Sequence, residues 1–189
     1  MMLAGTGTLV PASSAPAIDQ APILHVVRVN DLPGAENLEA ASGTLEVAYF
    51  AADNNSTADA THAERHFLTH AGFRGAAISE FEVNRSEHIK STAIELRSPD
   101  AAAHALAGEV SLSLRSQLPP GAHAAAKPDH AFAHATLITF RPGHSGWEGG
   151  LELIASQGSY VYELEATQKP DEVSRATLEA LLKTVMARA

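Results

Sequence analysis

Two neighbouring segments that alternate between apolar and polar residues constrain the fold of this chain more than any other feature. Residues 73–83 place Phe73 and Phe81 on one side, and residues 90–97 repeat the alternation around Ile94. A period of two is typical of a strand with one buried face. Because only the short polar segment NRSEH separates the two segments, we predict that they form an antiparallel hairpin.

Five further segments have the composition or the alternation of strands. They are residues 23–29, 45–51, 133–141, 151–155 and 159–165. The last two flank the turn-forming sequence Ser-Gln-Gly, which predicts a second tight hairpin.

Three segments carry helix signals. Thr61 and Glu64 form a capping-box pattern, and the helix that follows is expected to end at Gly72. Residues 98–100, Ser-Pro-Asp, supply a capping oxygen, a proline suited to the first helical position and a carboxylate at the positive end of the helix dipole. That second helix is expected to run to about residue 116.

A terminal helix is predicted from Pro170 onward. Its apolar residues recur at helical spacing and form one stripe, which consists of Val173, Leu178, Leu181, Leu182 and Val185. The predicted order of elements is therefore β-β-α-β-β-α-β-β-β-α, with mostly hairpin connections. This order predicts an α+β fold: a mainly antiparallel sheet with about three helices packed on one face.

The chain is expected to form one domain over residues 23–189. Residues 1–17 contain no charged side chain and end on Ala-Pro-Ala, which fits the small residues before a signal-peptidase cut. A basic start is missing, since the first basic residue other than histidine is Arg28. We therefore expect residues 1–22 to be either a signal-peptide remnant or a disordered arm.

Charge and cysteine content exclude several classes of function. The 189 residues carry a formal net charge of −9, and an acidic chain of this kind is a poor partner for nucleic acid or anionic membranes. The absence of cysteine excludes disulfides, thiolate metal sites and a cysteine nucleophile. No stretch is long and apolar enough to predict a membrane span. We also predict no cofactor.

Several short motifs resemble those of the small, alanine-rich secreted and lipoprotein-type domains of unknown function found in actinobacteria. They lie at residues 31–34, 71–73, 97–102 and 158–162, and the resemblance covers residues 31–189. The resemblance implies an extracytoplasmic module without catalysis. The sequence departs from the lipoproteins because it has no lipobox cysteine, which favours a freely secreted form.

Histidine spacing suggests one metal site. His62, His66 and His70 are each four residues apart, so neighbours stack one turn apart on a helix, and such a pair of imidazoles can chelate an ion. Glu64 does not fit the zinc signature His-Glu-x-x-His, since it stands two residues after the first histidine. The alternative is a partly exposed helix flank without metal.

The glycine-rich segment at residues 141–150 holds the only tryptophan. We predict a ligand or partner contact at His144, Trp147 and Glu148, because loops on a rigid scaffold often carry binding residues. The alternative is a wide hairpin with Trp147 packed on the core. A third possibility is a small hydrolase with a site near His144 and Ser145, although the segment lacks the full Gly-x-Ser-x-Gly motif.

Two pairs of carboxylates fall on single strand faces. Glu80 pairs with Glu82, and Glu163 pairs with Glu165, and such pairs can perform acid–base chemistry when their pKa values differ. Because no apolar shield is evident around them, we expect all four to be solvated.

The leading functional hypothesis is a secreted, non-catalytic binding or interaction module acting on a protein or a small-molecule ligand. It has two alternatives, a histidine-rich metal-binding protein and the small hydrolase. A cytoplasmic location is the alternative to secretion, because a chain without cysteine suits both compartments.

Overall fold

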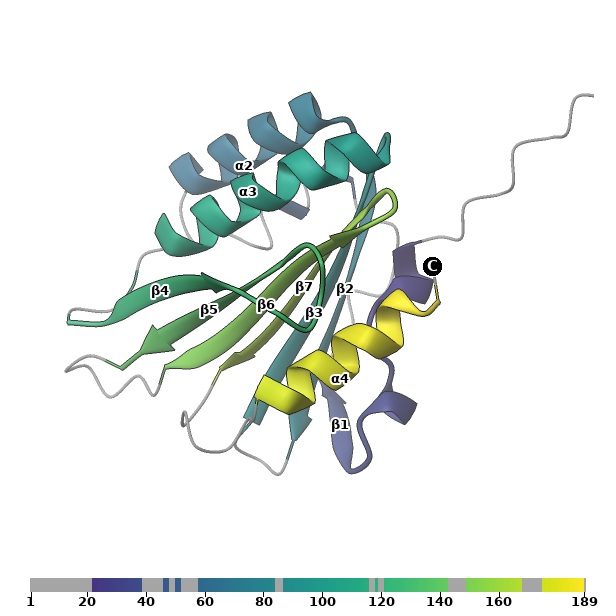
Figure 1. Ribbon diagram of the computed structural model, residues 1–189, viewed down its shortest axis with the longest axis vertical. Helices are drawn as coiled ribbons and strands as arrows, with labels where there is room; N and C mark the ends of the chain where they lie inside the picture. Colours follow the sequence, from purple (N-terminus) through teal and green to yellow (C-terminus); the bar gives the residue numbers. More distant parts are fainter. Residues whose placement is uncertain are drawn as a thin grey trace, which may run out of the picture.

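The computed structural model describes residues 22–38, 46–47, 50–51, 58–83, 87–115, 118, 121–142, 149–167 and 175–188. Its centre is one antiparallel sheet of seven strands in the order β1-β2-β3-β7-β6-β5-β4 (Figure 1). The strands are β1 (Ala35–Leu38), β2 (Phe73–Val83), β3 (Glu87–Leu96), β4 (His123–Pro128), β5 (Ala135–Arg141), β6 (Gly150–Gln157) and β7 (Tyr160–Thr167). The predicted α+β class and antiparallel sheet are confirmed.

Both predicted hairpins are present. β2 pairs with β3 from Phe73 opposite Leu96 to Val83 opposite Glu87. β6 pairs with β7 around a turn at Gly158, whose positive φ of 56° suits glycine. β7 also pairs with β3, so the two hairpins join at the middle of the sheet.

The helices that pack on the sheet are α2 (Ala58–Ala71), α3 (Pro99–Arg115) and α4 (Arg175–Met186). α3 begins directly after its predicted cap, Ser98. α2 begins at Ala58 and contains Thr61, so the capping box predicted there is wrong. α2 stops at Gly72, which has a φ of 82°. At the start of α3 the Ser98 hydroxyl accepts a hydrogen bond from the Ala101 amide at 3.2 Å, as an N-cap should.

The helices lie on both faces of the sheet. α2 and α3 cover one face and α4 crosses the other (Figure 1), where two separate groups of buried apolar side chains meet them. The prediction that about three helices share one face is therefore corrected. The reason is visible in β6, where neighbouring Leu153 and Ile154 are both fully buried but point to opposite faces. A sheet that is apolar on both faces needs a cover on each.

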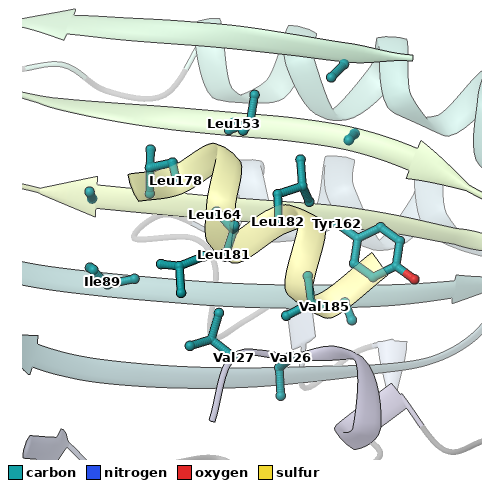
Figure 2. Close-up of a cluster of buried hydrophobic side chains, with 14 of the residues drawn as sticks. Val26, Val27, Ile89, Leu153, Tyr162, Leu164, Leu178, Leu181, Leu182 and Val185 are labelled. Atoms are coloured by element: carbon teal, nitrogen blue, oxygen red, sulfur yellow. The ribbon is translucent and has the colours of Figure 1, made fainter. Parts of the chain in front are cut away.

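α4 buries the stripe that its spacing predicts. Leu178, Leu181, Leu182 and Val185 point from the helix onto the strands (Figure 2). The strands supply Ile89, Leu153, Tyr162 and Leu164, and the N-terminal segment adds Val26 and Val27 at the edge of the same cluster.

Residues 23–29 are not a strand, contrary to the prediction. They include the 3₁₀ helix η1 (Pro22–His25), and the second 3₁₀ helix η2 (Val29–Asp31) begins at their end. The backbone of the segment binds serine side chains of the sheet. The Val27 amide donates to Ser91 Oγ at 3.0 Å, and Ser79 Oγ donates to the Val27 carbonyl at 2.8 Å. The chain therefore crosses over the sheet face and does not extend the sheet.

Residues 45–51 are also not a strand where the structure describes them. Val47, Phe50 and Ala51 are helical, and the Phe50 amide donates to the Glu46 carbonyl at 2.9 Å. Phe50 is fully buried, with its ring 6.1 Å from that of Phe73. A short apolar run fits both helical and strand periods, and here burial against the sheet selects the helix.

The two edge strands, β1 and β4, were not expected. β4 lies in a segment to which the sequence analysis assigned no strand or helix, and its sequence HAAAKP is rich in alanine, which is depleted in strands. Its pairing with β5 is made by the backbone, and Pro128 is tolerated because it ends an edge strand. Edge strands of this kind leave little side-chain pattern in a sequence.

Arg188 ties the end of the chain to its N-terminal segment. Its Nη1 donates to the Val26 carbonyl at 2.9 Å, and its Nη2 donates to Asp31 Oδ2 at 2.6 Å. The same carboxylate oxygen accepts from the Arg28 amide at 2.7 Å. Charge-assisted hydrogen bonds of this type are stronger than neutral ones, so the contact stabilises the packing of the segment on the α4 face.

Replacing Arg188 with alanine is expected to lower the free energy of unfolding by about 1–2 kcal/mol, because Asp31 and the Val26 carbonyl lose their donor. Urea denaturation followed by circular dichroism measures this change. Lys183→Ala is the control, since it removes an exposed cation from α4, shortly before Arg188, and should change stability by about 0.5 kcal/mol or less. Equal losses in both variants would contradict a specific role for Arg188.

Candidate functional site

All three predicted ligand-contact residues, His144, Trp147 and Glu148, lie outside the described residues, as does Ser145. The contact at this loop and the hydrolase site therefore stay predictions. The described chain resumes at Gly149, where β6 begins one residue later.

The structure brings together two of the three predicted histidine ligands. His62, His66 and His70 all lie on the exposed side of α2. The Nε2 atoms of His66 and His70 are 3.1 Å apart, with ring centroids separated by 4.3 Å. Among the residues that the structure describes, no group of three or more histidines, aspartates or glutamates is arranged to hold a metal ion. The predicted trio is thus reduced to a pair.

A row of charged side chains crosses the sheet on the face that α2 and α3 cover. The strand register places Glu80 opposite Lys90, Lys90 opposite Glu165, and Glu165 opposite Glu152. Directly opposite residues have Cβ atoms about 5 Å apart, so these four form one continuous row over four strands. We call it the acidic row. Glu152 is buried and accepts a hydrogen bond from Ser113 Oγ of α3 at 3.1 Å.

Three more carboxylates adjoin the acidic row. Glu163 lies on the same face of β7, two residues before Glu165, and is partly buried. Glu64 of α2 and Glu109 of α3 are each 3% exposed and act electrostatically on Glu163 and on one another. The Oε1 atom of Glu109 is buried without a hydrogen-bond partner. The two helices therefore cover a cluster of carboxylates on the sheet, and one oxygen of this cluster has no hydrogen-bond partner among the described residues.

Burial raises the pKa values of these carboxyl groups. Desolvation is the largest cause at every position, and repulsion between neighbouring carboxylates adds to it. It holds the pKa values of Glu109 and Glu152 well above their ordinary range and raises the pKa of Glu163 to about 8. The pKa of Glu165 is also raised, although Lys90 opposes the shift. The prediction that Glu163 and Glu165 stand on a solvated strand face is therefore corrected, because both side chains are only partly exposed.

With a pKa of about 8, Glu163 keeps its proton at neutral pH. The raised pKa values beside it have the same cause, because full ionisation would place Glu152 and Glu165 directly opposite each other as like charges with one nearby lysine ammonium. A positively charged group that entered the site would favour ionisation and displace bound protons. The site can therefore bind cations, release protons or do both together.

Glu109 and Glu152 were missed by the sequence analysis, although both left a signal. Glu109 continues the buried spacing of Ala102 and Ala105 along α3, so it stands on the apolar face of that helix. Glu152 shares its strand face with Ile154, which is fully buried. A carboxylate at an apolar position of two separate elements was the feature to look for.

No known protein family matches the sequence, and no curated protein matches it. A search of solved structures finds the extracellular domain of PknH from Mycobacterium tuberculosis, an actinobacterium. The similarity has a TM-score of 0.53 and 8% sequence identity, and it covers 82% of this chain and 86% of that chain. At this identity the likeness shows the fold alone. The fold is therefore similar to that of one actinobacterial extracellular domain.

No helix within the described ranges has the length and apolar character needed to cross a membrane.

Proposed function

We propose that this chain is an extracytoplasmic, non-catalytic binding domain whose ligand carries a positive charge and is received at the acidic row. The observation that carries the proposal is the cluster of carboxylates from α2, α3, β6 and β7, in which the buried Oε1 of Glu109 has no hydrogen-bond partner within the described part of the chain and Lys90 is the positive charge that acts on Glu163. The extracytoplasmic location is supported by the fold shared with the PknH extracellular domain and by the leader-like residues 1–17.

The chemistry of the row favours an ammonium group. Lys90 already lies between Glu80 and Glu165, so the row receives an ammonium from within the chain. Glu163 and Glu165 are partly exposed, which provides contact with solvent. Charge-assisted hydrogen bonds from a ligand ammonium would satisfy the carboxylate oxygens and offset the repulsion between the carboxylates.

Binding without catalysis is proposed because two carboxyl groups of the site are deeply buried. Glu109 and Glu152 are 3% and 7% exposed and are covered by α3, so they are poorly placed to reach the reacting bond of a substrate. They are well placed to set the charge and the proton content of the site.

Isothermal titration with spermidine and putrescine tests the proposal. Because the cation must displace protons from carboxyl groups with raised pKa values, binding is expected to be about tenfold tighter at pH 8.5 than at pH 6. Titrations in two buffers of different ionisation enthalpy should show net proton release. Tetramethylammonium, which cannot donate a hydrogen bond, should bind more weakly.

Glu165→Gln should weaken spermidine binding by about tenfold, since it removes one charged acceptor. Glu36→Gln is the matched control, because Glu36 is an exposed carboxylate on β1 and should have no effect. Equal weakening by both substitutions, or binding that does not strengthen with pH, would contradict the proposed site.

A further inference from the structure

We propose that His66 and His70 form a two-histidine chelating site for a borderline divalent ion, namely Cu²⁺, Ni²⁺ or Zn²⁺, on the exposed side of α2. The proposal is independent of the acidic row, which involves the opposite, buried side of this helix through Glu64.

The distance between the two nitrogens carries the inference. The Nε2 atoms of His66 and His70 are 3.1 Å apart, so a single ion can lie within bonding distance of both. Imidazole nitrogens bind zinc at about 2.0–2.1 Å, and two such bonds with their nitrogens at this separation enclose an angle of about 100°. That angle lies between the values for square-planar and tetrahedral coordination, which are the geometries of Cu²⁺ or Ni²⁺ and of Zn²⁺.

The surroundings of the pair suit an ion from solution. Both side chains are exposed, so an ion has free access and water can complete its coordination. His70 lies in the last turn of α2, where the helix dipole favours positive charge. Without metal, one imidazole must donate to the other, a contact that depends on the tautomer of each ring. An ion would replace this contact with two coordinate bonds, one to the Nε2 lone pair of each imidazole.

The pair is distinguished from the third histidine of the helix. His62 is also exposed and stands four residues before His66, but the ring contact is formed between His66 and His70. Since the described residues contain no group of three potential ligands in range, the protein contributes two ligands. This arrangement predicts one ion per chain and moderate affinity.

Isothermal titration of the full chain with Cu²⁺, Ni²⁺ and Zn²⁺ salts tests the site. We expect one ion per chain, and the tightest binding for Cu²⁺. His66→Gln and His70→Gln should each weaken binding about a hundredfold, because each converts a chelating pair into a single ligand. His62→Gln, a matched change on the same exposed side of the helix, should leave binding unchanged. All three side chains are exposed, so the variants should remain folded, as thermal denaturation can verify.

Electron paramagnetic resonance of the Cu²⁺ complex gives a second readout. The wild-type spectrum should show coupling to two imidazole nitrogens, and the spectra of His66→Gln and His70→Gln should show one. The proposal is overturned if His62→Gln weakens binding as much as the other two changes. It is also overturned if one ion binds per two chains, or if the double variant His66→Gln, His70→Gln binds as tightly as the wild type.

Discussion

Raising the pH from 5 to 9 is expected to lower the free energy of unfolding, with a contribution from Glu163 on the order of 3 kcal/mol. Burial raises the pKa of Glu163 to about 8 in the folded protein, whereas the unfolded chain has the ordinary value near 4.5. The folded state therefore binds more protons across this interval. The stabilisation that proton binding at Glu163 gives to the folded protein is complete below the pKa of the unfolded state. It is lost as the pH rises through the pKa of the folded state.

Several charged groups share this titration. Glu163 is surrounded by Glu64 on α2, Glu109 on α3, Glu152 on β6, Glu165 on its own strand and Lys90 on β3, with Glu80 and His88 at the outer end of the row. The raised pKa values of Glu109, Glu152 and Glu165 act in the same direction. Lys90 and His88 oppose the shift at Glu165, since positive charge favours the ionised form.

Glu163→Gln isolates the effect. Glutamine has nearly the shape of a protonated carboxyl group but cannot ionise, so the variant should resemble the wild type at pH 5 and exceed its stability at pH 9. The melting temperature should rise by about 5–10 °C at the higher pH. Glu36→Gln provides the exposed control at both pH values. A wild-type stability advantage that grows with pH would show that Glu163 is ionised and paired in the folded state.

Replacing Leu182 with alanine is expected to cost about 3 kcal/mol, which corresponds to a decrease in melting temperature of about 10 °C. Leu182 is fully buried between α4 and the sheet, among Leu153, Tyr162 and Leu164 (Figure 2). Removal of its outer carbons loses apolar burial and leaves a cavity, because neighbours held by the sheet cannot collapse into it.

Chemical denaturation measures the loss, and Lys183→Ala serves again as the control because it alters the adjacent exposed position of the same helix. Nearly equal effects of the two substitutions would mean that α4 does not pack on the sheet. The pH dependence should survive in Leu182→Ala, since the acidic row lies on the opposite face of the sheet.

The elements that sequence patterns predicted best are those whose own residues carry the whole signal. The hairpin of β2 and β3 alternates over its full length, and α3 begins at a serine, proline and aspartate that together cap a helix. The strand predictions were wrong for residues 23–29 and 45–51, because contacts with distant parts of the chain bury Val26, Val27 and Phe50. Their apolar character was evident, but their backbone conformation depends on what covers them.

For the functional sites, the sequence by itself determined which residues could act together along one element: the histidine pair on α2 and the glutamate pairs on β2 and β7. Only the tertiary structure decided that Glu152 and Glu165 stand opposite each other and that Glu109 faces the row from α3. The physical reason is that a carboxyl group is solvated or shielded according to what packs above it. Strand alternation sets which way a side chain points, while the register of the sheet and the helices of the next layer set its neighbours, its burial and its charge.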